Sequence, residues 1–140
     1  MDYEIMTKHI LYELNINKRY IACDYIIYGI HLMKSDKNCV KHITKTLYVD
    51  IASKYDTTSI CVERVIRTTI ETIWKNKKDH IELIEKIFGQ EYLSYRPTNT
   101  EFFQLLYDYI ESHVSDESDR QCPFYGSKFC VIANGEFKAT

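Results

Sequence analysis

The sequence predicts an all-α domain of six helices over residues 1–115, which contains a helix-turn-helix and is followed by a short extension over 116–140. Glycine (4) and proline (2) are scarce among the 140 residues, which disfavours the turn-dense all-β folds. Apolar side chains before residue 115 recur at the three- and four-residue intervals of helices packed on one face. A chain of this length can bury a hydrophobic core without cross-links.

The first three helices are predicted from the spacing of large apolar side chains. Ile10 and Leu14 belong to the first, and a broad apolar surface after residue 18 indicates that the second is largely buried. In the third, Ile43, Leu47 and Ile51 follow one another at four-residue intervals. The expected ranges are 3–14, 18–33 and 40–55.

The fourth helix, over about 58–75, is strongly amphipathic. Thr57 or Thr58 is expected to accept an otherwise unpaired backbone amide of its first turn. The residues expected to face the core are Val62, Val65, Ile66, Thr69, Ile70 and Ile73. The outward residues form two rows, one of Thr57, Cys61, Arg64 and Thr68, and the other of Ile60, Glu63, Arg67 and Glu71.

The last two helices and the extension are marked by caps and turns. Asp79 is expected to cap a fifth helix that ends near residue 88, and Gly89 suits the position after a helix C-terminus. Thr98 or Asn99 is expected to cap a sixth helix that ends near residue 113 or 114. In the extension, β-type residues before Asn-Gly indicate a β-hairpin, which needs a packing surface to be stable.

Composition and motifs exclude several classes of protein. There is no run of about 18 apolar residues and no signal-type N-terminus, so we expect a soluble, cytoplasmic protein with no membrane partner. Five scattered cysteines without a C-x-x-C pair argue against a disulfide scaffold or a zinc site. No phosphate loop or hydrolase motif occurs, so neither an enzyme nor a cofactor is expected. Cys122 and Cys130 could form half a metal site or a redox pair, although a packed hairpin with two thiols is the simpler interpretation.

The charges are unevenly distributed, although the net charge is only −2. Residues 34–78 contain ten Lys or Arg against five Asp or Glu, whereas residues 79–140 contain five against eleven. The positive part coincides with the third and fourth helices. This asymmetry indicates one cationic face, for which DNA is a suitable partner.

The segment from Asp50 to Trp74 has the layout of a helix-turn-helix. Ala52 is small enough for two helices to cross closely, and Asp56 is a polar residue that can adopt a bent conformation at the corner. The exposed side of the second helix could then reach base edges in a major groove, which admits one helix. Any two amphipathic helices of a bundle share much of this pattern, so the spacing alone leaves a structural role open.

A dense series of residues in and around this segment matches one protein family. The matching residues are Lys18, Tyr20, Ile43, Thr44, Lys45, Leu47, Tyr48, Asp50, Ile51, Ala52, Lys54, Tyr55, Thr57, Thr58, Val62, Glu63, Arg64, Ile66, Arg67, Ile70, Glu71, Trp74, Phe88, Gly89, Pro97, Thr98, Asn99, Glu101 and Phe102. On these residues the chain resembles, over about 5–113, the C-terminal effector domain of the sporulation response regulator of endospore-forming bacteria, stage-zero sporulation protein A.

The resemblance implies a six-helix domain whose fourth helix, about 58–75, enters the major groove of double-stranded DNA. It also implies binding as a homodimer or head-to-tail pair on repeated short boxes, with action as activator and repressor; RNA polymerase is a further candidate partner. By position, Arg64 and Arg67 match arginines that contact bases or phosphates, and Glu63 matches an acidic neighbour. Arg can recognise guanine as a fork and Glu can accept from cytosine N4. An ion pair of Glu63 with Arg67 within the helix is the alternative, and the two roles are compatible.

The chain departs from the family on the outward face of the fourth helix. Cys61 stands where the family has arginine and Thr68 where it has histidine; both remain candidate base contacts. Because losing a fork donor can cost about 1–3 kcal/mol of base discrimination, a changed target sequence or weaker binding is expected. Val49 replaces a proline of the family. The family's N-terminal receiver is not found in these 140 residues, so phosphorelay control is not expected.

Hydroxyl groups and lysines around the fourth helix are candidate phosphate contacts, which position a protein on DNA without specifying its sequence. For each lysine, a solvated surface side chain is the alternative. The candidates are Thr57, Thr58, Ser59, Lys41, Lys45, Lys54, Lys75, Lys77 and Lys78.

Three functions therefore compete. The first is a sequence-specific transcriptional regulator. The second is a protein-interaction module or antagonist that keeps the fold with weak or no DNA binding. Cys61, Thr68 and the acidic C-terminal half are the observations that support it. The third is a thiol or metal sensor built on the extension, and it has the least support.

Overall fold

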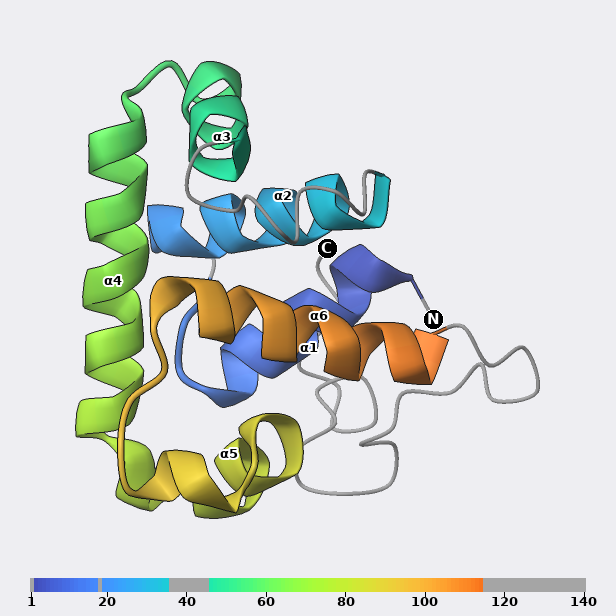
Figure 1. The fold of residues 1–140 in the computed structure, drawn as a ribbon, viewed down its shortest axis with the longest axis vertical. Coiled ribbons are helices and arrows are strands. Elements are labelled where there is room, and N and C mark those ends of the chain that lie inside the picture. The colour runs from blue at the N-terminus through green and yellow to red at the C-terminus, as the bar shows by residue number, and fades with distance from the viewer. Residues whose placement is uncertain (1, 18, 36–45, 115–140) are drawn as a thin grey trace.

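The computed structural model describes residues 2–17, 19–35 and 46–114, which form six α-helices and two short 3-10 helices (Figure 1). No strand occurs within these ranges, and the predicted all-α class is confirmed. The hairpin expected in 116–140 and the lysines at 41 and 45 lie outside the described residues. The elements are α1 (Tyr3–Glu13), α2 (Ile21–Ser35), α3 (Tyr48–Lys54), α4 (Ser59–Lys75), η3 (Lys77–Asp79), α5 (Ile81–Phe88), η4 (Gln90–Leu93) and α6 (Asn99–Val114).

Helices α1, α2 and α6 pack against one another and supply much of the core. Met6, Ile26 and Phe103, one from each helix, are completely buried. At Gly29, α2 passes so close to α6 that an added Cβ would lie 2.7 Å from the ring of Phe103. A side chain at residue 29 would therefore force this ring to shift, which explains the glycine in the middle of a helix.

Helix α4 stands along one side of this group, with α3 at its N-terminal end and α5 at its C-terminal end (Figure 1). Its inner face is apolar, and the spacing of its buried residues is the helical period predicted from the sequence. Val65 and Thr69, which were also expected to face the core, are only half-buried because they lie at the edge of this face. The buried residues of α4 are Val62, Ile66, Ile70, Ile73 and Trp74.

Trp74 anchors the C-terminal end of α4 to the next two helices. Its ring meets Phe88 of α5 edge-on at 5.1 Å between centroids, and Phe102 of α6 at 6.5 Å. The indole Nε1 donates a hydrogen bond of 2.7 Å to the buried backbone oxygen of Tyr92. Since the polar edge of the indole is satisfied, its burial has no uncompensated cost, and α4 is fixed relative to α5 and α6.

Several boundaries differ from those predicted. Helix α2 begins at Ile21 rather than at residue 18. Helix α3 covers Tyr48–Lys54, and residues 40–45 of the expected range 40–55 lie outside the described residues. The expectation that Asp79 caps α5 was wrong. The amides of Asp79 and His80 are bonded to carbonyls of a 3-10 turn, at 3.0 and 2.9 Å, so the helix begins later. His80 occupies the N-cap position, and its side chain makes no capping hydrogen bond to the first turn of α5.

The glycine expected after α5 and the cap expected before α6 are both present. Gly89 follows α5 with φ of 103°, a left-handed conformation that favours glycine. Of the two candidates before α6, Thr98 is the cap: its hydroxyl accepts from the amide of Glu101 at 3.1 Å, and the Glu101 carboxylate accepts from the amide of Thr98 at 2.9 Å. None of the described helices combines the length and the apolar character needed to cross a bilayer.

Candidate nucleic-acid interface

The connection between α3 and α4 is a tight turn held by the backbone. The amide of Tyr55 donates to the carbonyl of Ile51 at 3.1 Å. The amide of Thr57 donates to the carbonyl of Ala52 at 2.9 Å. Between them, Asp56 has φ of 54°, a left-handed conformation that aspartate tolerates better than most residues. The bent polar corner predicted from the sequence is therefore present, next to the buried Ala52.

Thr58 caps the N-terminus of α4. Its backbone is extended (φ −109°, ψ 155°), and its side-chain oxygen accepts from the amide of Cys61 at 3.2 Å. Of the two candidate threonines, Thr57 and Thr58, it is therefore Thr58 that caps α4. Thr57 and Ser59 are half-buried beside it, and Thr58 itself is exposed. This cap fixes where α4 begins, and thereby which residues face outward.

The outward face of α4 holds most of the predicted base contacts. Because the opposite face is packed in the core, a partner would meet α4 chiefly through the side chains of this outward face. Glu63 is half-buried at the edge of this face. The exposed residues are Ile60, Cys61, Arg64, Arg67, Thr68, Glu71, Thr72 and Lys75.

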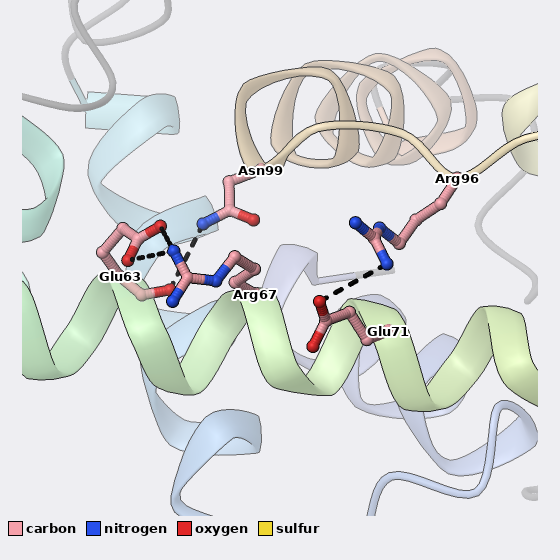
Figure 2. Close-up of polar contacts among 5 residues, drawn as sticks. All are labelled: Glu63, Arg67, Glu71, Arg96 and Asn99. Carbon is pink, nitrogen blue, oxygen red and sulfur yellow. Dashed lines mark hydrogen bonds and ion pairs between the residues drawn. The ribbon is translucent and has the colours of Figure 1, made fainter.

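Glu63 and Arg67 form an ion pair within α4 (Figure 2). Nη1 of Arg67 lies 2.9 Å from one carboxylate oxygen of Glu63 and 3.2 Å from the other. Asn99, at the start of α6, donates from its amide to the backbone oxygen of Glu63 at 3.3 Å. The intrahelical pair considered from the spacing of the two residues is thus present, and α6 adds a contact on the same side of α4.

Arg64 and Thr68 lie on the other side of the outward face. There they line a shallow groove of about 290 Å³ together with residues 20–22, at the start of α2. Tyr20 and Ile21 are 54% and 45% exposed. No carboxylate in the described part of the chain forms an ion pair with Arg64. The two outward arginines therefore differ, because Arg67 is held by an acid whereas Arg64 lies beside apolar surface.

Arg96 lies beside α4, although no sequence pattern placed it there. Its Nη1 is 3.4 Å from a carboxylate oxygen of Glu71 (Figure 2). Arg96 precedes α6, and Glu71 belongs to the outward face of α4. Periodicity reports neighbours within one helix, so it could not reveal a contact that depends on the path of the chain between α5 and α6.

Four of the predicted phosphate-contacting lysines lie near the ends of α4, namely Lys54, Lys75, Lys77 and Lys78. Lys54 is in the last turn of α3, with its Nζ 5.5 Å from the centroid of the Tyr28 ring. Lys75 is the last residue of α4, and Lys77 and Lys78 belong to η3. With 17 residues α4 is about 26 Å long, so these two groups could contact well-separated phosphates.

Cys61 differs chemically from the other cysteine in the described ranges. Contacts with the side-chain hydroxyls of Thr58 and then Thr57 lower the pKa of the Cys61 thiol, and the charge of Arg64 acts in the same direction. Burial raises the pKa of Cys23 to about 11. Within the described residues no three His, Cys, Asp or Glu side chains are grouped so that they could hold a metal ion. Cys122 and Cys130 lie outside those residues.

The profile of the family described as "Sporulation initiation factor Spo0A C terminal" matches residues 7–110. The match runs from α1 into α6 and therefore includes the α3–α4 turn, the outward face of α4 and the segment that carries Arg96. The family is that of the DNA-binding effector domain of a sporulation regulator and is not a family of enzymes. The chain thus belongs to the family of the C-terminal domain of sporulation initiation factor Spo0A.

Proposed function

We propose that this domain is a sequence-specific DNA-binding transcriptional regulator, in which α3 and α4 act as a helix-turn-helix and α4 enters the major groove. The observation that carries the proposal is the two-sided character of α4. Its inner face is buried, whereas its outer face presents Arg64 and Arg67 to solvent. A helix fixed in this way can enter a groove about 12 Å wide without unpacking the core.

The geometry suggests a distribution of roles among the exposed residues. Arg64 can form the two-bond fork to guanine, and Arg67 with Glu63 can meet a neighbouring base pair as a donor beside an acceptor. Cys61 and Thr68 are exposed in the row of Arg64, and their short side chains would let the bases come close to α4. Candidate phosphate contacts are Thr57, Thr58, Ser59, Lys54, Lys75, Lys77 and Lys78.

We extend the proposal to pairs of domains on repeated boxes, with RNA polymerase as a further partner. This extension rests on membership of the family, whose full-length regulator acts in transcription. A pair on DNA would show as a second, cooperative band in a mobility-shift titration with two boxes. A duplex with one box would give a single band.

A selection from random duplexes, repeated at several salt concentrations, tests the proposal. We expect a short motif to enrich and the logarithm of affinity to fall with the logarithm of salt, with a slope of about 0.9 for each phosphate contact. Binding that enriches no motif and lacks a slope of several contacts would overturn it.

A protein-interaction module with the same fold is the second candidate, and two observations favour it. The ion pairs of Glu63 with Arg67 and of Glu71 with Arg96 neutralise part of the positive charge around α4. Tyr20 and Ile21 also expose apolar surface beside that helix. This function predicts that the chain lowers the DNA affinity of a full-length relative in a mixed titration, while its own affinity for DNA is negligible.

A further inference from the structure

The segment between α5 and α6 runs back along α4. Tyr92 accepts the hydrogen bond of Trp74, Arg96 meets Glu71, and Asn99 donates to the backbone of Glu63. As the residue number along the segment rises from 92 to 99, the residue number of the partner on α4 falls from 74 to 63. Figure 1 shows this antiparallel course, with the chain passing from α5 along α4 to the start of α6.

Arg96 is held at a defined place within this segment. Pro97, which follows it, is buried, and Thr98 is fixed by the capping box with Glu101. On the other side, the Tyr95 ring packs on Tyr92 at 5.0 Å between centroids. The backbone on both sides of Arg96 is thereby tied to the core, while its side chain remains 48% exposed.

The charge and donor groups of Arg96 suit a phosphate. Arg96 is the only cationic residue in the sequence from 89 to 99, so it supplies the positive charge of this segment. The ion pair with Glu71 joins Nη1 of Arg96 to a carboxylate oxygen at 3.4 Å. A guanidinium has five N–H donors in a planar fork, so the side chain can keep Glu71 and still donate to phosphate oxygens.

A helix in a major groove has a sugar-phosphate strand on each side. A segment that runs alongside that helix therefore faces one of these two strands. We propose that Arg96 is a DNA-backbone contact on one side of α4 and that Glu71 positions it. This role rests on the proposed entry of α4 into the major groove. Arg96 then adds affinity without adding base specificity, unlike Arg64 on the opposite side of the outward face.

The test compares Arg96→Ala with wild type on a duplex that carries the selected box and on a scrambled duplex of equal length. We expect similar losses on both duplexes and a salt slope lower by about 0.9. Between about 50 and about 200 mM salt, the affinity of the variant should therefore fall about 3.5-fold less than that of wild type. Arg96→Lys, which keeps the charge, should retain most of the slope.

Lys34→Ala is the matched control, because it removes one exposed positive charge at the end of α2 far from α4 (Figure 1). It should leave the slope unchanged. The pair of Arg96 with Glu71 is largely exposed, and such pairs contribute little to stability, so Arg96→Ala should unfold at nearly the wild-type temperature.

Three results would overturn the inference. An unchanged slope in Arg96→Ala, while wild type binds the box normally, removes Arg96 from the interface and leaves the proposed function intact. A loss confined to the box makes Arg96 a base contact. Wild type that binds neither duplex overturns the proposed function together with this inference.

The positioning role of Glu71 has its own readout. Glu71→Gln removes an acid beside the phosphates and should raise affinity for both duplexes. If Glu71 holds Arg96 in place, Arg96→Ala should lower affinity by a smaller factor in the Glu71→Gln background than in wild type. Equal factors in the two backgrounds would show that Glu71 does not position Arg96.

Discussion

Arg64 and Arg67 are both exposed on α4, yet their surroundings differ. Arg67 is bound by both oxygens of Glu63, whereas Arg64 lies beside apolar surface at the start of α2. A guanidinium that first has to leave a carboxylate gains less from binding a base. Arg64 is accordingly the stronger candidate for base discrimination.

Arg64→Ala should relax the preference at one base position. The expected loss is about 1–3 kcal/mol for the preferred base, with little change for the others, because a fork to guanine is lost. Lys77→Ala is the comparison, since it should weaken all sequences alike. Binding of each variant to four duplexes that differ at one position measures this, and equal patterns of loss in both variants would contradict the assigned roles.

Cys61 and Thr68 should determine how this domain differs from its family. Cys61→Arg introduces the arginine that the resemblance implies at that position, and Thr68→His introduces the histidine that it implies. Each should shift the motif enriched by selection at one position, because both residues are exposed in the row of Arg64. A motif unchanged by both substitutions would remove this row from base recognition.

Most of these side chains could be predicted from the sequence, because each lies on the outward side of a single helix. The period of α4 places Cys61, Arg64 and Thr68 together without knowledge of any other element. Arg96 and Asn99 could not be found in this way. They reach α4 only because the chain folds back along it after α5, and the hydrogen bond of Trp74 to Tyr92 is the first contact on that path.

At the scale of elements, α4 was the most predictable helix because its periodicity, cap and length agree. The threonine cap was expected from sequence and is supplied by Thr58. The start of α5 was mispredicted because Asp79, a good cap by residue type, belongs to a 3-10 turn. The local preference of threonine for the cap position set the start of α4. The geometry of the preceding 3-10 turn set the start of α5.

Thr58→Ala should lower the free energy of unfolding by about 1 kcal/mol, because the amide of Cys61 loses its acceptor. Thr58→Ser keeps the hydroxyl and should stay close to wild type. Urea unfolding followed by circular dichroism measures both. A Thr58→Ala variant as stable as wild type would show that the cap does not stabilise α4.

At the scale of the whole molecule, the buried histidines His9 and His80 connect stability to pH. Burial lowers the pKa of His9 and of His80 from the ordinary value of 6.5, and for His80 the charge of Asp79 opposes this shift. The unfolded chain therefore takes up protons near pH 6.5 that the folded domain does not. The free energy of unfolding is therefore highest above pH 6.5, and it decreases as the pH falls below 6.5.

The free energy of unfolding should accordingly decrease below pH 6.5, by at most about 1.4 kcal/mol per pH unit for each histidine. His80→Gln should make this decrease less steep. Urea unfolding at pH 7.5 and at lower pH values measures the slope. A slope that His80→Gln leaves unchanged would contradict the linkage.

The central claim concerns the whole domain on its DNA, namely that α4 occupies the major groove. Guanine N7 lies in that groove, so its methylation by dimethyl sulfate reports occupancy directly. On a duplex carrying the selected box, the domain should protect at least one guanine N7. Arg64→Ala, added at a concentration that saturates the duplex, should lose that protection. A saturated wild-type complex in which every guanine N7 reacts as in free DNA would contradict the claim.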